Sequence, residues 1–193
     1  MRYRALAVTA FLTLAGAVAA AADDFVGNII DTAGSLPRRS SSHFTLHVDQ
    51  YTPLEEAQRM AGVLLSQGTE PVLKELRKLD HGYIKIGTSL GYHVGMIRSL
   101  DAPDGGRIIR AVTDRPIQMF ELMNNTRSSD HEFGLVELKL GADGKGEGQL
   151  IAAAKVTIDQ SGNVQVESLG TRPFTITNIK TKVKKEKDVK GSR

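Results

Sequence analysis

The sequence predicts an α+β domain in which an N-terminal helical pair packs on a curved, mostly antiparallel sheet of about seven to nine strands. Three observations predict this class. Apolar residues recur at helical spacing within residues 52–79. Strand-like segments then fill residues 83–183. Turn-forming sequences rich in Gly, Asp, Asn and Pro separate these segments, as in hairpins. Such a sheet either wraps a helix or curls toward a barrel.

Residues 1–22 have the three parts of a cleavable secretory signal peptide. The start is basic, Ala5–Ala20 carries no charge, and three alanines offer a cleavage site before Asp23. The uncharged run falls short of the roughly 20 strongly apolar residues that span a membrane, and no later run is longer. We therefore predict an extracytoplasmic protein, periplasmic or secreted, with no transmembrane segment in its mature chain.

Shifts in composition divide the rest of the chain into three parts. Residues 23–42 read as a linker or lead-in, residues 43–183 as a single globular domain, and residues 184–193 as a basic disordered tail. The absence of cysteine excludes disulfides, thiolate metal sites and a cysteine nucleophile. Aromatic residues make up only 5% of the chain, which argues against a stacking surface for nucleic acid.

The first strand and the helical pair have clear local signals. Residues 43–49 alternate, with Phe44, Leu46 and Val48 on one face, as in a half-buried strand. Thr52 is a candidate N-cap for the helix that follows, and Gly68 breaks the helical segment in two. The expected apolar stripes are formed by Leu54, Ala57, Ala61, Leu64 and Leu65 in the first helix and by Val72, Leu73, Leu76 and Leu79 in the second.

Eight further segments are expected to be strands. They are 83–87, 91–99, 107–114, 117–123, 133–140, 147–158, 163–169 and 173–183. Segment 117–123 also fits a helical turn, so its type stays open. The glycine-rich sequence 141–148 predicts a hairpin turn, with a weak calcium loop as the alternative. Within 147–158, we expect the even-numbered apolar residues from Leu150 to Ile158 to form one inward face.

The histidines do not predict a metal site. His43 and His47 lie four residues apart on a strand, a span of roughly 13 Å, so one ion cannot bind both rings. We expect both to be solvated. His81, His93 and His131 are scattered among turns and strand ends, where histidine is usually polar surface. No cofactor or metal is indicated.

Basic residues gather at the C-terminal end. Residues 180–193 hold seven basic and two acidic side chains, so the excess of positive charge belongs to the tail. We predict that this tail binds an anionic envelope surface, with a solubilising tail as the alternative. Export argues against a nucleic-acid partner. The residues expected to form the tether are Lys182, Lys184, Lys185, Lys187 and Lys190.

These features favour a non-catalytic exported domain that binds a partner protein or a small apolar ligand. The pocket is expected between the inner face of the curved sheet and the helical pair. One alternative is an extracytoplasmic enzyme with a polar site in the sheet concavity, for which His93, Asp114 and Arg115 are the candidate residues. The other is an envelope-associated structural protein tethered by its basic tail. The motifs of familiar exported hydrolases are absent from the sequence.

Overall fold

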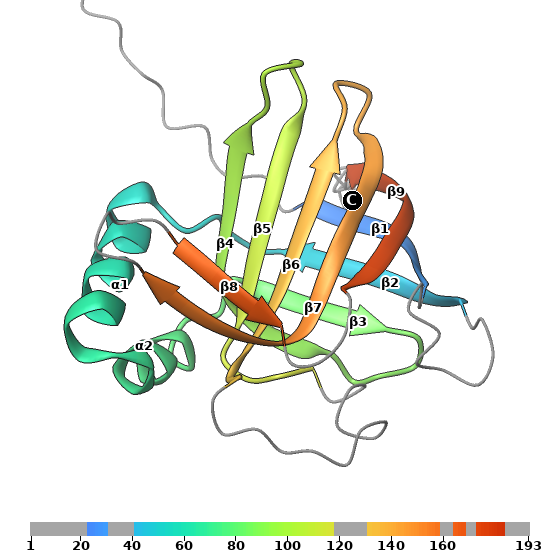
Figure 1. The fold of residues 1–193 in the computed structure, drawn as a ribbon. Helices are drawn as coiled ribbons and strands as arrows, with labels where there is room; N and C mark the ends of the chain where they lie inside the picture. Colours follow the sequence, from blue (N-terminus) through green and yellow to red (C-terminus); the bar gives the residue numbers. More distant parts are fainter. Residues whose placement is uncertain (1–22, 31–40, 118–130, 159–163, 169–172, 184–193) are drawn as a thin grey trace, which may run out of the picture.

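The computed structural model describes residues 23–30, 41–117, 131–158, 164–168 and 173–183. Nine strands and two helices make up this part of the chain (Figure 1). In chain order they are β1 (Asp23–Ile30), β2 (Ser41–Val48), α1 (Leu54–Gln67), α2 (Thr69–Leu76), β3 (Gly82–Ile86), β4 (Tyr92–Asp101), β5 (Arg107–Thr113), β6 (Phe133–Leu140), β7 (Lys145–Ile158), β8 (Val164–Ser168) and β9 (Phe174–Val183).

Eight of the strands form a closed antiparallel barrel. The order β6-β5-β4-β3-β2-β1-β9-β7 is closed by a further pairing of β6 with β7. Each neighbouring pair is antiparallel. The ninth strand, β8, pairs with the C-terminal part of β7 outside the barrel. The expected antiparallel sheet with a helical pair is therefore present, but the fold is mostly β and the sheet closes on itself.

Apolar side chains fill the barrel interior. Phe25, Phe44, Leu46, Ile84 and Leu138 have no solvent exposure and belong to one cluster with residues from every barrel strand. Phe44, Leu46 and Val48 share the buried side of β2, as their alternation predicts. Small eight-stranded barrels have room for such a packed interior. The interior therefore stabilises the fold, and described side chains pack the inner face of the sheet, which we expected to form the pocket together with the helical pair.

Residues Asp23–Ile30 correct the expected lead-in. They form β1, which pairs with β2 on one side and β9 on the other, and Phe25 lies in the barrel core. The segment is short and its alternation is interrupted by polar residues, so its sequence resembles a linker. Long-range pairing with β9 makes it a strand. Four predicted segments lie wholly or partly outside the described residues. They are the proposed signal peptide 1–22, the lead-in from residue 31 to residue 40, residues 118–123 of segment 117–123, and the tail 184–193.

Two helices separated at Gly68 cover one side of the barrel, as predicted (Figure 1). Gly68 has φ 82°, a left-handed conformation that favours glycine and ends α1. Leu76 of α2 packs against Gly95 of β4, where an added Cβ would lie 2.5 Å from the Leu76 carbonyl oxygen. The missing side chain at Gly95 therefore lets α2 approach the sheet closely.

The buried face of α1 differs from the predicted stripe. Leu54 and Leu65 are 51% and 61% exposed, whereas Met60, which the stripe omitted, is buried. Thr52 does not cap the helix either. Pro53 is the N-cap residue, and no side-chain hydrogen bond caps this end. The Thr52 hydroxyl instead accepts a hydrogen bond from the Ile97 N–H and contacts His81 Nδ1 at 2.7 Å, so Thr52 joins the start of α1 to β4.

A β-bulge in β7 corrects its predicted single inward face. The register between β6 and β7 shifts between the pairs Leu135↔Ile151 and Phe133↔Ala154. Leu150 and Ala152 lie in the barrel core, but Ala154 and Val156 pack in a second cluster with Phe133 and the helices. One extra residue in a strand exchanges its two faces. The even-numbered residues therefore face the barrel interior before the bulge and the helices after it.

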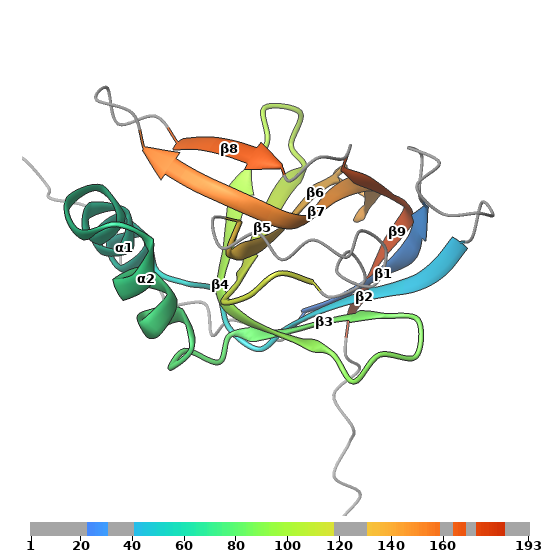
Figure 2. The ribbon, with the colours of Figure 1, turned by 60° about the horizontal axis from the view of Figure 1, so that its bottom comes forward.

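Beyond this bulge, β7 leaves the barrel and forms a two-stranded ribbon with β8. Figure 2 shows this ribbon extending from the barrel toward α1. Ala154–Ile158 pair with Val164–Ser168 in this ribbon, and α1 contacts β7. Among the described residues, neither helix is long and apolar enough to cross a membrane.

Candidate functional site

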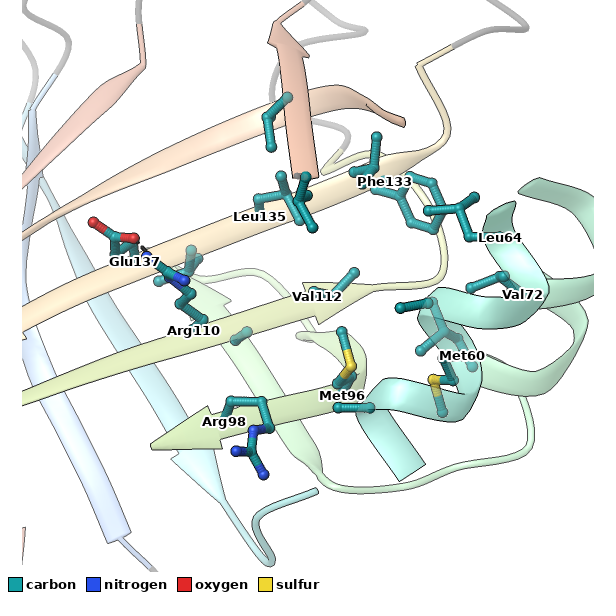
Figure 3. Close-up of a pocket in the computed structure, with 18 of the residues that line it drawn as sticks. Met60, Leu64, Val72, Met96, Arg98, Arg110, Val112, Phe133, Leu135 and Glu137 are labelled. Carbon is teal, nitrogen blue, oxygen red and sulfur yellow. Dashed lines mark hydrogen bonds and ion pairs between the residues drawn. The ribbon is translucent and has the colours of Figure 1, made fainter. Parts of the chain in front are cut away.

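A groove of about 490 Å³ lies on the outer face of the barrel. Its floor is the outward side of β4–β7, its end wall is the helical pair, and the β7–β8 ribbon covers it in part (Figure 3). The volume lies within the ~300–1,000 Å³ that is typical of small-molecule pockets. We call this cavity the outer groove. It lies beside the helices and the ribbon, outside a barrel whose interior is filled by apolar side chains.

Apolar side chains line most of the outer groove. Strand register places Met96, Val112, Leu135 and Ile151 side by side across β4, β5, β6 and β7. These four residues are only partly buried and pack on the second cluster, which contains Met60, Val72 and Phe133. Figure 3 shows Met60, Leu64 and Val72 of the helices beside Phe133 and Met96. We call the four cross-strand residues the apolar row.

The covering ribbon also presents apolar side chains to solvent. Val164 and Val166 of β8 are 61% and 45% exposed, and both line the groove. Val156 and Ile158 of β7 line the same side. Exposure of valine side chains to water is unfavourable. A bound apolar group that covered them would gain about 25 cal/mol of free energy per Å² of buried apolar surface. The roof of the groove thus has the same chemical character as its floor.

A polar row lies beside the apolar row, two residues away along each strand. It consists of Arg98, Arg110, Glu137 and Gln149, which are neighbours across β4, β5, β6 and β7. Two residues along a strand span roughly 6–7 Å, so the two rows run parallel at that spacing. All four polar residues line the outer groove. The groove therefore has an apolar end at the helices and a charged end away from them.

The two arginines of the polar row have different contacts. Arg110 Nε donates to Glu137 Oε2 at 2.8 Å (Figure 3). Arg98 Nη1 donates to the backbone oxygen of Thr52 at 2.8 Å. Among the described residues, no carboxylate lies within ion-pair distance of Arg98. The polar row thus holds two cations and one anion.

A second polar cluster lies where β1 begins. Asp23 accepts hydrogen bonds from the Tyr51 hydroxyl at 2.6 Å and from Arg107 Nη1 at 3.3 Å. The Arg107 guanidinium also lies over the Phe25 ring. Burial, and then the hydrogen bond to Asp23, raise the pKa of Tyr51 above its ordinary value. Tyr51 is therefore a protonated donor at neutral pH, and the cluster ties β1 to β5 and to the segment before α1.

His47 corrects the prediction of a solvated strand histidine. It is 8% exposed, its Nδ1 contacts Asp24, its Nε2 lies 3.0 Å from Asp49, and its ring stacks on Tyr83. His43, on the same strand, is exposed. The two histidines do not share a ligand.

The three residues proposed for a catalytic site do not form one group. His93 Nδ1 lies 3.9 Å from Asp114 Oδ1, and its Nε2 lies 3.5 Å from Asp80. Asp114 also pairs with Arg77 of the α2 end at 3.4 Å. The Arg115 guanidinium lies over the Tyr92 ring at 5.9 Å. His93 and Asp114 are thus neighbours, while Arg115 takes part in a separate cation–π contact outside the outer groove.

Two further sequence candidates, His81 and the glycine-rich turn, have contacts that stabilise the fold. His81 is 2% exposed, and burial lowers its pKa. Gly141–Gly144 forms the turn of the predicted β6–β7 hairpin, in which Asp143 accepts hydrogen bonds from the N–H and the ammonium of Lys145. The Lys145 hydrogen bonds lower the pKa of Asp143. Within the described part of the chain, no three metal-ligating side chains gather.

Of the residues predicted to form the basic tether, Lys182 lies in β9 opposite Asp24, with an exposed side chain. Lys184, Lys185, Lys187 and Lys190 lie outside the described residues.

Sequence reasoning missed the outer groove and its polar row. The outward positions of β4–β6 carry the signal, because Met96, Val112 and Leu135 are apolar where a solvated outer face would be polar. Arg98 was not singled out, since nothing local distinguishes it from a surface arginine. Its partnership with Arg110 depends on the register of β4 and β5.

Comparisons of the chain with protein families, with curated proteins and with solved structures found no match.

Proposed function

We propose that the protein is a non-catalytic binding domain that takes up a small apolar ligand in the outer groove. The observation that carries this proposal is the apolar row. Met96, Val112, Leu135 and Ile151 remain partly exposed on a face that two helices and the β7–β8 ribbon surround. Concave apolar surfaces of this size are the usual form of small-molecule sites. Hydrocarbon and thioether side chains bind by burial and carry no acid, base or nucleophile.

We further propose that the domain acts outside the cytoplasm. The support is the N-terminal sequence, whose basic start, uncharged run and alanine cleavage motif are typical of a signal peptide. A partner protein is the alternative to a small ligand. Such a partner could bind at β8, because β8 is the last strand in the sheet order and a peptide strand could extend the sheet at its free edge.

An enzyme remains the alternative class, with one observation in its favour. His93 lies between Asp80 and Asp114, and a histidine oriented by a carboxylate is a common general base. Asp114, however, already pairs with Arg77, and these groups lie outside the groove lining. The groove has the ligand-sized volume, and so binding is the function that we favour.

Filling the groove tests the proposal. Leu135→Trp places a large ring in the apolar row, and Leu90→Trp adds the same ring at a residue that is 101% exposed. We expect the parent and Leu90→Trp to bind the neutral apolar dye N-phenyl-1-naphthylamine, and Leu135→Trp to bind it at least about tenfold more weakly, a loss of roughly 1.4 kcal/mol. Dye fluorescence measures affinity, and circular dichroism checks that each variant is folded. Equal binding by a folded Leu135→Trp variant would place the dye elsewhere.

A further inference from the structure

We infer that the ligand of the outer groove is a single-chain amphiphile with a monoanionic carboxylate head, which lies over Arg98 and Arg110. This inference rests on the proposed function and adds the chemical class of the ligand. Its carrying observation is the juxtaposition of the polar row and the apolar row on one surface (Figure 3).

The direct pairing of Arg98 with Arg110 is the first argument. Like charges directly opposite each other on neighbouring strands destabilise a sheet. Here the two arginines are cross-strand partners on β4 and β5, and both line the groove. Their side chains point apart, Arg110 toward Glu137 and Arg98 toward the Thr52 carbonyl (Figure 3), and a negative charge over the pair would further reduce the repulsion. Glu137 supplies one such charge to Arg110, at 2.8 Å, but Arg98 has only a backbone partner among its described contacts.

The charge balance of the polar row selects a monoanion. Arg98 and Arg110 face one carboxylate, Glu137, and Gln149 is neutral. In the next row, Lys139 also pairs with Glu137, at 3.5 Å, and its cross-strand partner Glu147 adds a second carboxylate, so these five side chains hold three positive and two negative charges. One positive charge is therefore left over at the open end of the groove. A planar carboxylate also suits the donor fork of a guanidinium, which has unused N–H groups at Arg98.

The arrangement along the strands selects an elongated ligand. A head group over the polar row would have its chain directed past Met96, Val112 and Leu135 toward Met60 and Phe133. The volume of about 490 Å³ is that of one small ligand. The geometry thus assigns the carboxylate to the strand end of the groove and the hydrocarbon chain to the helix end.

Three dodecyl compounds that differ only in their heads test the inference on the full mature chain at pH 8, below their aggregation limits. These are dodecanoate, dodecanol and dodecyltrimethylammonium, measured by displacement of the neutral dye. We expect dodecanoate to bind about tenfold more tightly than dodecanol, because charge-assisted hydrogen bonds form only with the carboxylate. The cationic compound should bind most weakly.

Variants assign the effect to the polar row. Arg98→Gln should reduce dodecanoate affinity to that of dodecanol and leave dodecanol unchanged, whereas Arg98→Lys should retain part of the preference. Arg115→Gln removes an arginine outside the groove lining and should change nothing. Because Arg98 also holds the Thr52 carbonyl, Arg110→Gln provides a second variant that keeps this contact.

The outcomes separate this inference from the function on which it rests. Equal affinities for dodecanoate and dodecanol, or a preference that Arg98→Gln and Arg110→Gln both leave intact, would overturn the inference while groove binding stands. Tighter binding of the cationic compound would overturn it as well. Failure of the neutral dye and of all three dodecyl compounds to bind would overturn the proposed function itself.

Discussion

At the scale of single residues, polar side chains inside this protein join elements that are distant in sequence. Thr52 accepts a hydrogen bond from the Ile97 N–H, and it contacts His81, which precedes β3. The Thr52 hydroxyl can donate its proton to Nδ1 of a neutral His81 while it accepts from Ile97. A residue that looked like a helix cap therefore connects the start of α1 with β3 and β4.

The buried His81 should make the fold sensitive to mild acid. Burial lowers its pKa below the ordinary 6.5, although Glu56 and Asp80 oppose this effect and His93 adds to it. Above pH 6.5 His81 is neutral in both states. As the pH falls below 6.5, the unfolded chain takes up the proton more readily than the folded one, so the free energy of unfolding decreases. Urea unfolding at pH 7.5 and pH 5 measures the change.

Two variants isolate this histidine. His81→Gln should reduce the difference in unfolding free energy between the two pH values, while His43→Gln, at an exposed position of β2, should leave it as in the parent. If the two variants show the same pH dependence, the acid sensitivity has another origin.

At the scale of elements, the helices owe their position to a few buried contacts. Leu76 is 1% exposed and lies on Gly95 of β4, whereas Leu64 is only partly buried and Leu65 is 61% exposed. Leu76→Ala should lower the free energy of unfolding by about 2–5 kcal/mol, because it leaves a cavity against the sheet. Leu64→Ala should cost less.

Leu65→Ala is the matched control, since it removes the same atoms from a solvent-exposed site and should change stability by less than about 0.5 kcal/mol. Urea unfolding of the three variants provides the comparison. If Leu65→Ala lowers the free energy of unfolding as much as Leu76→Ala does, the helices pack on the sheet through a different face from the one described.

The bulge in β7 precedes Val156 and Ile158, which line the outer groove. Before it, alternate residues fill the barrel, and after it the same parity faces the helices and carries the ribbon with β8. Bulges exchange the faces of a strand because they insert one residue into a period of two. Around the bulge, residues Leu150–Ala154 are apolar at both odd and even positions, so the sequence suits both surroundings and hides the position of the exchange.

At the scale of the whole molecule, charge is distributed unevenly between the fold and its C-terminal end. Residues 184–193 contain five basic and two acidic side chains. We predict that they tether the protein to anionic membranes, at about 1 kcal/mol per basic residue near the surface, with the attraction weakened by salt. Sedimentation with anionic and neutral vesicles measures the binding.

The truncation for this experiment ends at Val183, because Lys182 and Val183 pair with β1 and belong to the fold. Binding to anionic vesicles alone, lost in the truncated chain, is the expected result. If the truncated chain binds equally well, the tail is a solubilising segment and the envelope-tethered structural role has lost its support.

The sequence by itself determined the local features of this fold. The alternation of Phe44, Leu46 and Val48 identified β2, Gly68 marked the break between the helices, and the turn residues located the β6–β7 hairpin. These features depend on periodicities of 2.0 and 3.6 residues and on turn conformations, which neighbouring residues set.

Only the tertiary structure decided the closure of the barrel, the identity of β1 as a strand and the place of the candidate site. Each depends on partners far apart in the chain, such as Asp23 with Val183 and β6 with β7. Arg98, Arg110 and Glu137 come from three different strands, and their meeting depends on register, which a one-residue bulge changes. Because long-range pairing sets register, the groove and its charged end could be recognised only once the strands were in place.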